Sequence, residues 1–363
     1  MKSRTIFTFQ AKEGMCISKD VFNSTGQLLV AEGTEINNKV KEMLSFYSVM
    51  KINVYDKEIS TEVKPAPPVI NTDTYSQRVK NSERFQEFKK SFSANVKQFQ
   101  SDIITFVNKT DEVDLKNLKK EPYSVLSKSD TTISVFDMLH NIEDYNDSTY
   151  SHSLNVALIS NVIGNWIGYN EQDLEVLTLA GLLHDIGKLM VPEDILKKPD
   201  KLTDEEFQLI KLHPIMGYDL IKDENLDPRI KEAILKHHEK CDGSGYPSML
   251  KGDNINEFAK IIAIADIYDA MTSKRSYREA LCPFEVIRLF EDEGFQKYDA
   301  KILINFLERI GQAYINNHVE LSDGRRGEII LLNKNALSKP VVKIKDTIVD
   351  LSKTHNLTIT KIL

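Results

Sequence analysis

The segment from Leu177 to Pro192, LTLAGLLHDIGKLMVP, places His184 and Asp185 inside an otherwise apolar helical pattern. A carboxylate buried in such a helix costs several kcal/mol unless a positive charge or a metal ion compensates it. The segment KIIAIADIYDAMTSKR, residues 260–275, repeats the arrangement with Asp266. Two acids in core helices therefore predict a shared cation.

Histidines gather in the same helical region. Singly, each is more typical of an ordinary surface or core position than of a ligand, but together with the two acids they make seven candidate metal ligands. The five histidines are His152, His184, His213, His237 and His238. A salt bridge from Lys188 to an acid is the structural alternative, but one lysine does not account for five histidines.

The ligand types narrow the choice of metal. Imidazole nitrogens and carboxylates suit Zn, Mn, Fe, Ni or Co, whereas Ca prefers oxygen ligands alone. Seven ligands exceed what one ion usually takes from a protein, so two ions bridged by a carboxylate fit better. Such pairs activate water, and the ligand count thus favours metal-assisted hydrolysis.

Composition excludes several classes of protein. The chain has 363 residues, 41% of them hydrophobic, which is enough for a sizeable core and for more than one domain. Its formal net charge of -7 argues against general binding of polymeric nucleic acid. Cys16, Cys241 and Cys282 are too few and too far apart for a disulfide framework. With no apolar signal core or membrane-length run, we expect a cytoplasmic protein without membrane insertion.

The pattern along the chain predicts a mainly α protein with small β-rich modules at both ends. Alternating runs such as MCISKDVF and QLLVAEG indicate strands in the first module, with a turn at residues 23–26 between them. A helix is expected in NNKVKEMLSFYS and a further strand in MKINVYD. Capping signals at Thr203 with Glu206, and at Asp227 before Pro228, support the helical part. The predicted organisation is residues 1–56 as a β-rich module, 57–75 as a linker, 76–123 as a long Phe-rich helix and connection, 124–318 as the helical catalytic domain, and 319–363 as a β-rich module.

The Phe-rich helix carries an apolar seam with spacings of three and four residues. The seam consists of Phe85, Phe88, Phe92, Val96, Phe99, Ile103 and Phe106. A seam of this length could pair two copies of the chain into a homodimer or dock on the helical domain that follows. The sequence leaves both alternatives open.

The run HHEKCDGSGYP, residues 237–247, changes character abruptly after the two histidines. Gly243 and Gly245 stop a helix and permit a tight turn, which presents Tyr246 on a loop or simply caps the helix. Glu239 and Asp242 could orient the histidines or fix this loop. Further on, Arg275 and Arg278 lie three residues apart. This spacing is compatible with two arginines that bind phosphate and also with a solvated basic patch.

Three motifs carry a family resemblance. HDIGK (184–188), HHEKCDGSGYP (237–247) and DIYDAMTSKRSYR (266–278) resemble the signature elements of the HD-GYP family, a branch of the HD phosphohydrolase superfamily. Characterised members hydrolyse the bacterial second messenger cyclic di-GMP. The resemblance is strong over about residues 151–276 and looser over 124–318. It implies an all-helical HD-type domain that binds two divalent transition-metal ions, with Fe or Mn favoured and Zn, Ni or Co possible.

The resemblance also implies roles for individual residues. The superfamily quartet of ligands corresponds to His152, His184, Asp185 and Asp266, and the second ion would take His213, His237 and His238 with Asp185 as the bridge. Asp185 and Lys188 would be catalytic, and Lys188 would also touch the substrate phosphate. Tyr246, Arg275 and Arg278 would hold the substrate's bases and phosphates.

Two positions depart from the family pattern. Some members bind a third metal with a glutamate four residues before the first histidine, and here that position is Ser148. Serine is a poor neutral ligand, so we expect two ions, although Asp147 lies beside it. Ser276 stands where the family often has proline, which predicts a looser loop.

The sequence therefore predicts a cytoplasmic metal-dependent phosphodiesterase that converts cyclic di-GMP to pGpG or GMP in bacterial signalling. One alternative is an HD-GYP enzyme for another cyclic dinucleotide, such as cyclic GMP-AMP. Another is a catalytically weak nucleotide-binding signalling module, for which a missing ligand would be the mark. All seven ligand residues are present.

Overall fold

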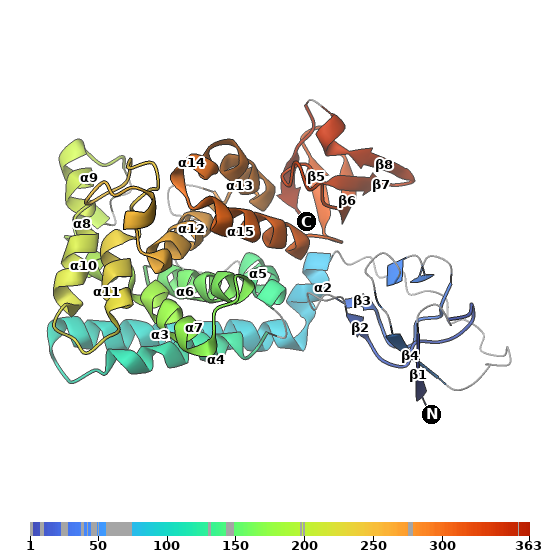
Figure 1. Ribbon diagram of the computed structural model, residues 1–363, viewed down its shortest axis with the longest axis horizontal. Coiled ribbons are helices and arrows are strands. Elements are labelled where there is room, and N and C mark those ends of the chain that lie inside the picture. Colours follow the sequence, from blue (N-terminus) through green and yellow to red (C-terminus); the bar gives the residue numbers. More distant parts are fainter. Residues whose placement is uncertain are drawn as a thin grey trace. The chain divides into compact units, whose positions relative to one another are not determined.

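The computed structural model describes residues 3–7, 11–22, 28–37, 40–41, 43–44, 49, 51–55, 75–129, 132–142, 149–196, 198, 200–274, 279–354 and 356–363. The chain divides into two compact units, Met1–Thr72 and Asp73–Leu363. Helices dominate the second unit, and small antiparallel sheets occur towards both ends of the chain, which confirms the predicted fold class (Figure 1).

The first unit is built from two short antiparallel ribbons. β1 (Ser3–Phe7) pairs with β4 (Lys51–Tyr55), and β2 (Val21–Phe22) pairs with β3 (Leu28–Val30). The patterns predicted the last three strands but not β1. Much of the expected helix in NNKVKEMLSFYS, and the turn before β3, lie outside the described residues. The unit has its own apolar core, formed by Ala11, Ile17, Val21, Val30, Ile36, Val40, Leu44, Ile52 and Val54.

The second unit begins with a long run of helical elements. These are α2 (Tyr75–Asn81), α3 (Glu83–Asn108), η2 (Leu115–Lys119), α4 (Lys120–Leu126), α5 (Thr132–Asn141), α6 (Thr149–Trp166), α7 (Glu171–Leu183), η3 (Ile186–Met190), α8 (Glu193–Leu196), α9 (Asp204–Ile210), α10 (His213–Ile221), α11 (Pro228–Lys236), η4 (Gly252–Asn254), α12 (Glu257–Thr272), α13 (Pro283–Leu289), η5 (Phe290–Gly294), α14 (Phe295–Lys297) and α15 (Ala300–Ala313). The Thr203–Glu206 capping box and the Asp227 cap both form, as predicted.

The Phe-rich helix α3 packs within its own chain. Five of its seam residues, Phe85, Phe88, Phe92, Phe99 and Ile103, are buried in the core of the second unit. The helix lies against α4, α5 and α6, and Figure 1 shows it running along one side of the bundle. The seam therefore docks on the helical domain of its own chain, which is one of the two alternatives. The buried face of α3 is not available to a second copy of the chain. A homodimer formed through this helix would have to use its exposed side, and it stays a prediction.

The C-terminal strands form one antiparallel sheet in the order β8-β7-β6-β5-β9. Their bounds are β5 (His318–Leu321), β6 (Arg326–Leu331), β7 (Val341–Ile344), β8 (Thr347–Asp350) and β9 (Ile359–Ile362), with the short η6 (Leu351–Lys353) before β9. Val319, Ile329 and Val342 belong to the same apolar core as the helices. The Glu291 carboxylate of η5 also accepts hydrogen bonds from the amides of Leu337 and Ser338, at 2.6 and 3.3 Å.

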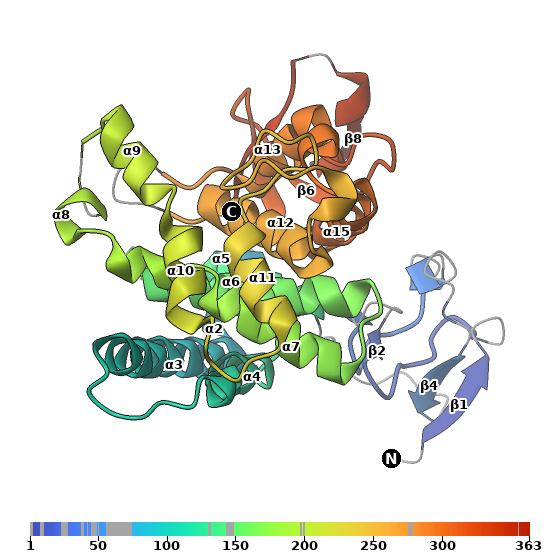
Figure 2. The same cartoon turned by 60° about the vertical axis from the view of Figure 1, so that its left-hand side comes forward.

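Five helices converge to build the centre of the second unit. α6 packs against α7 and α12, and α10 packs against α11 and η3. Small residues allow this close approach, because a Cβ atom at Gly181 of α7 would lie only 3.1 Å from the Cα atom of Ala157 on α6. Figure 2 shows α8 and α9 extending from this group of helices.

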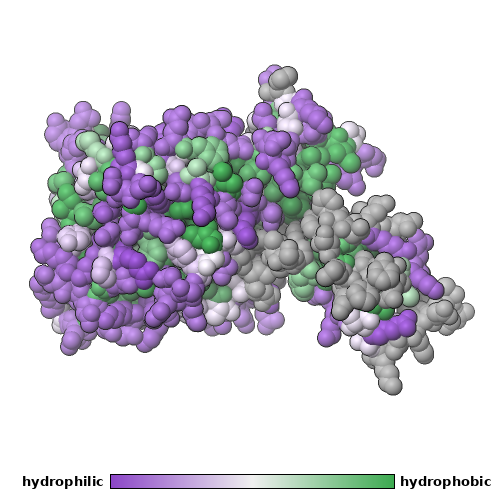
Figure 3. Space-filling view, in the orientation of Figure 1, coloured by the Kyte–Doolittle hydropathy of each residue, from purple (hydrophilic) through white to green (hydrophobic). Residues whose placement is uncertain are grey.

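The surface of the second unit follows the expected distribution of polarity. The face in Figure 3 is mainly hydrophilic over the helices, since their apolar residues are buried in the core. Among the described helices, none combines the length and the apolar character that a membrane crossing requires. The predicted cytoplasmic location stays a prediction.

Candidate metal centre

The Asp185 carboxylate lies between two groups of histidines. α7 ends at Leu183, His184 caps it, and the chain leaves the helix at Asp185 before η3 begins. Asp185 Oδ2 is 3.3 Å from Nε2 of His184 and 3.6 Å from Nε2 of His152. Asp185 Oδ1 is 3.2 Å from Nε2 of His213 and 3.8 Å from Nε2 of His237. One buried carboxylate therefore faces both groups, as a bridging ligand must.

The first group, called group 1, consists of His152, His184 and Asp266 around Asp185. His152 lies in the first turn of α6, and Asp266 lies on α12. His152 Nε2 is 3.0 Å from Oδ1 of Asp266. Ligand atoms of His152, His184 and Asp185 all lie within 4.8 Å of one another.

The second group, called group 2, consists of His213, His237 and His238 around Asp185. His213 begins α10, whereas His237 caps α11 and His238 follows it. The Nε2 atoms of His213 and His237 are 3.2 Å apart, and His238 Nδ1 is 3.8 Å from Oδ2 of Asp266. The group's ligand atoms and one of Asp185 also lie within 4.8 Å of one another. The structure thus brings all seven sequence-predicted ligand residues together.

Three of the histidines are oriented by the same backbone contact. The Nδ1 atoms of His184, His213 and His237 lie 2.7, 2.7 and 2.8 Å from the carbonyl oxygens of the residues three positions earlier, Gly181, Ile210 and Ile234. A carbonyl can only accept a hydrogen bond, so each Nδ1 carries the proton and each Nε2 keeps its lone pair. These lone pairs face the centre of the site.

The electrostatics of the centre suit a bound cation. Burial raises the pKa of Asp185, but neighbouring His184 and Lys188 outweigh it and hold the pKa well below its usual range. Burial also lowers the pKa of His237 well below its usual value, and it lowers the pKa of His238 to about 3. The carboxylate is therefore ionised and these two rings are neutral near pH 7, which are the protonation states that metal ligands need.

Two buried atoms test directly whether a metal fits. His184 Nε2 and Asp185 Oδ1 have no hydrogen-bond partner within the part of the chain that the structure describes. Buried polar atoms are normally paired, and each unpaired one costs about 1–3 kcal/mol. A divalent cation bound by both groups would satisfy these atoms, and the nitrogen and oxygen donors fit a transition metal.

Lys188 contacts the centre in a way that the sequence considered only as an alternative. Its Nζ donates to Oδ2 of Asp185 at 2.5 Å, and 22% of the side chain is exposed. The salt bridge between a lysine and a core acid therefore forms alongside the histidine cluster. The exposed part of Lys188 is the part available to a substrate.

The loop after the histidines is shaped by glycine and by two acids. A Cβ atom at Gly245 would lie 2.4 to 2.5 Å from backbone atoms of residues 238–240, so the chain can only fold back there with glycine. The buried Glu239 carboxylate accepts hydrogen bonds from the amides of Ser248 and Leu250, at 2.6 and 2.9 Å. Asp242 accepts from the amide of Ser244 at 2.8 Å. Both acids thus contact the loop backbone.

Tyr246 packs against a histidine of group 2. Its ring stacks on that of His238, with centroids 4.6 Å apart and planes inclined by 27°. The peptide bond from Tyr246 to Pro247 is cis. The Nζ atom of Lys211 is 5.3 Å from the Tyr246 ring and 5.4 Å from the ring of Phe207 on α9. The loop therefore carries Tyr246 to the edge of the metal centre.

Two neighbours of the centre were missed by the sequence reasoning. Asp269 lies one turn after Asp266 on α12, and its carboxylate is 2.6 Å from Nδ1 of His152. Its spacing of three residues from Asp266 was the available signal, since both face the same side of a helix. Lys211 precedes His213 by two residues, and no pattern indicated its contact with Tyr246.

Several predicted positions lie outside the described residues. These are Arg275, Ser276 and Arg278 in the expected substrate-binding segment, and Asp147 and Ser148 at the expected position of a third metal ligand. Their assigned roles stay predictions.

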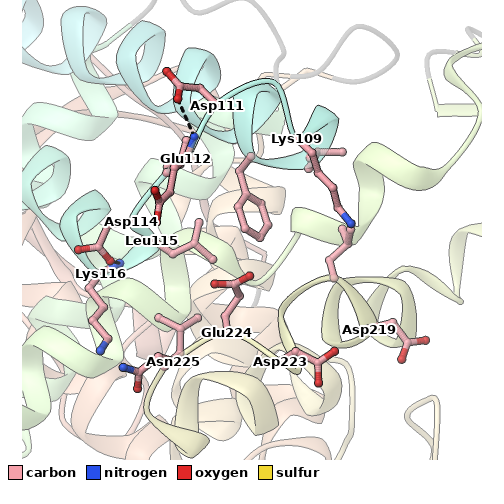
Figure 4. A pocket seen from close by; sticks show the side chains of 15 residues that line it. Lys109, Asp111, Glu112, Asp114, Leu115, Lys116, Asp219, Asp223, Glu224 and Asn225 are labelled. Atoms are coloured by element: carbon pink, nitrogen blue, oxygen red, sulfur yellow. Dashed lines mark hydrogen bonds between the residues drawn. The ribbon is translucent and has the colours of Figure 1, made fainter.

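A separate hollow of about 770 Å³ lies between the end of α3 and the end of α10. Figure 4 shows that its labelled side chains are mostly charged, including Asp111, Glu112, Asp223 and Glu224. None of the predicted ligand or substrate residues lines it. The hollow is therefore distinct from the metal centre.

Comparisons with known proteins find similar sequences for the helical part of the chain. Residues 138–302 match the HD domain family. The chain is 35% identical over 197 residues to cyclic di-GMP phosphodiesterase PA4108 of Pseudomonas aeruginosa, which covers 54% of this chain and 47% of that protein. It is 34% identical over 207 residues to a cyclic di-GMP phosphodiesterase of Thermotoga maritima, covering 53% and 56%. It is also 34% identical over 178 residues to the 3'3'-cGAMP-specific phosphodiesterase 2 of Vibrio cholerae, covering 48% and 32%. These alignments span about half or less of the length of each relative.

Proposed function

We infer that this chain, whose residues 138–302 belong to the HD domain family, is a metal-dependent phosphodiesterase that hydrolyses cyclic di-GMP. The observation that carries the proposal is the position of Asp185. Its buried carboxylate faces group 1 through one oxygen and group 2 through the other. A single shared carboxylate between two histidine groups is an arrangement that can hold two metal ions next to each other, as in dinuclear hydrolytic centres.

The two groups would hold one ion each. His152, His184, Asp185 and Asp266 would bind the first ion, and Asp185 with group 2 would bind the second. Two bound ions supply Lewis-acid polarisation of a phosphodiester and acidify water to near-neutral pKa. Iron or manganese is the preferred assignment, and zinc, nickel and cobalt also suit the ligands.

The chain's own residues would position the substrate. Lys188 would contribute positive charge to the phosphate, because its contact with Asp185 keeps the amine next to the centre. Tyr246 would present a ring to a substrate base, because it lies on a loop directly beside His238. Arg275 and Arg278 would add phosphate contacts, as their sequence motif indicates.

The choice of cyclic di-GMP rests on relatives. Two of the similar proteins are named as cyclic di-GMP phosphodiesterases, and the aligned region contains the ligand motifs. A relative named as specific for 3'3'-cGAMP is also 34% identical, so this dinucleotide is the second candidate substrate. Either the linear dinucleotide pGpG or GMP would be the product. A catalytically weak signalling module is the remaining alternative, but the complete set of ligands argues against it.

Turnover by the purified full-length chain tests the proposal. With Mn²⁺ or Fe²⁺ under anaerobic conditions, we expect hydrolysis of cyclic di-GMP, measured by separation of the nucleotide products. A variant with both His237→Ala and His238→Ala is expected to lose turnover and one bound ion, because two of the three histidines of group 2 are removed. His140→Ala changes an exposed histidine on α5 and is the matched control, expected to behave as wild type.

The outcomes separate the candidate functions. Cleavage of 3'3'-cGAMP with cyclic di-GMP left intact would change the substrate but not the chemistry. Binding of two ions and of nucleotide without cleavage would identify a signalling module. Full activity in the double histidine variant would contradict the role of group 2.

Tyr246 should affect binding more than the chemical step. Tyr246→Phe keeps the ring on His238 but removes the hydroxyl, so we expect KM to rise by roughly 2- to 10-fold, the worth of one hydrogen bond, with little change in kcat. Tyr246→Ala also removes the stacked ring and should raise KM further. Steady-state kinetics of both variants measure this difference. A fall in kcat without a change in KM for Tyr246→Phe would contradict a binding role.

A further inference from the structure

His152 is held differently from the other buried histidines of the centre. His184, His213 and His237 each donate from Nδ1 to a backbone carbonyl three residues earlier in their own segment. His152 Nδ1 instead contacts a side chain, the Asp269 carboxylate, at 2.6 Å. That contact joins residues that are 117 positions apart in the sequence. The contact that orients His152 is therefore made by a side chain, which a substitution can remove, whereas a backbone carbonyl remains after any substitution.

Asp269 is itself firmly fixed. It is 4% exposed, and its second oxygen, Oδ1, accepts hydrogen bonds from Asn155 Nδ2 at 2.8 Å and from Ser273 Oγ at 3.0 Å. The two carboxylate oxygens thus have separate tasks, since Oδ2 faces His152 and Oδ1 receives the two supporting donors. A carboxylate held in this way has little freedom to rotate away from the imidazole.

The contacts around His152 connect α6 to the neighbouring helix α12. His152 and Asn155 are three residues apart on α6, and Asp266 and Asp269 are three apart on α12, so each pair lies on one helix face. The two helices pack against each other in the bundle (Figure 1). His152 is therefore located between Asp269 at its Nδ1 atom and Asp266 at its Nε2 atom.

We propose that Asp269 is the positioning residue for group 1, which fixes His152 with Nδ1 protonated and the Nε2 lone pair directed at the first ion. The proposal rests on the proposed function, because it takes group 1 as a metal site. A carboxylate accepts the Nδ1 proton but cannot donate one, so of the two neutral tautomers only the one with a free Nε2 is compatible with it. Partners of this kind are worth about 10- to 100-fold in metal affinity.

Asparagine at this position distinguishes orientation from mere packing. Asp269→Asn keeps the shape, but the amide has one accepting oxygen and one donating nitrogen in place of two accepting oxygens. If the amide nitrogen faces His152, the ring must accept at Nδ1 and protonate Nε2, which blocks the ligand position. If the amide oxygen faces His152, the nitrogen faces the donors of Asn155 and Ser273. Either arrangement weakens the binding-competent tautomer.

The experiment is a calorimetric titration of the metal-stripped full-length protein with Mn²⁺. Wild type is expected to bind two ions, and Asp269→Asn to bind one of them about 10- to 100-fold more weakly with the other unchanged. Asp350→Asn is the matched control, because it makes the same chemical change at a carboxylate that accepts two hydrogen bonds from Ser352 outside the centre. The thermal midpoint of the metal-free proteins should differ little among the three.

A second comparison tests whether Asp269 acts through His152. In a His152→Ala background, Asp269→Asn should cause no further loss of metal affinity, since the imidazole that it orients is gone. An equal further loss in that background would overturn the proposal, as would wild-type affinity for both ions in Asp269→Asn. Equal weakening of both ions would also overturn it, because it would indicate a general disturbance of the fold.

The titration remains informative if the enzyme assignment fails. A wild-type chain that binds two ions but cleaves no cyclic dinucleotide would contradict the proposed function, while the selective effect of Asp269→Asn on one ion would still support the positioning role. A wild-type chain that binds no ion would overturn both.

Discussion

Asp185→Asn is expected to remove both metal ions and to lower kcat by on the order of a thousandfold or more. The neutral amide loses the negative charge that both groups share, and it turns an N–H donor towards one of them. Each oxygen of Asp185 faces a different group, so neither group keeps an intact ligand set. Metal content by mass spectrometry and turnover of cyclic di-GMP measure the two losses.

Asp266→Asn is the informative comparison for that variant. Asp266 contacts His152 at 3.0 Å, but its nearest approach to group 2 is 3.8 Å from His238. We therefore expect Asp266→Asn to lose mainly the first ion, whereas Asp185→Asn loses both. If Asp185→Asn kept one ion at wild-type affinity, the carboxylate would not be a bridge.

Gly187→Ala should destabilise the fold and separate the two sides of the centre. A Cβ atom at Gly187 would lie 2.0 Å from the carbonyl oxygen of His213 and 2.5 Å from the amide nitrogen of Gly217. Both contacts are to backbone, so η3 must move away from α10, and Asp185 moves away from His213. Overpacking of this kind typically costs about 1–3 kcal/mol of unfolding free energy, and more where backbone cannot shift.

Thermal unfolding and metal content together test the Gly187 prediction. Gly168→Ala is the control: its φ of 91° makes alanine strained, but no atom lies within 4 Å of the added carbon. That control should lower the thermal midpoint while keeping both ions. Gly187→Ala should lower the midpoint and also lose the second ion. Retention of both ions by Gly187→Ala would mean that the site tolerates the displacement of η3.

The ligand residues could be predicted because they violate the local pattern. His184 and Asp185 directly follow the apolar run that forms the end of α7, and polar residues at the end of an apolar run can be recognised without knowledge of distant segments. The centre brings together residues from α6, α7, α10, α11 and α12. The sequence predicted that these segments meet only because its motifs resemble those of a known family. Predicting residue types was therefore easier than predicting which of them meet.

Contacts between distant segments were the part that the sequence did not disclose. In the sequence, nothing distinguishes Asp269 from the acids that occur on helix surfaces. Only the packing of α12 on α6 places its carboxylate next to His152. The apolar seam of α3 was evident from its period, but a period does not say what covers the seam. Lys211 contacts Tyr246 where the glycine turn folds the loop back onto residues 238–240.

The two ends of the chain differ in where their apolar residues are buried. The first unit buries its apolar residues in a core of its own. The C-terminal sheet shares its core with the helices that hold the ligands. Deletion of the sheet would expose that core to water, so we expect the helical part without the sheet to unfold or aggregate.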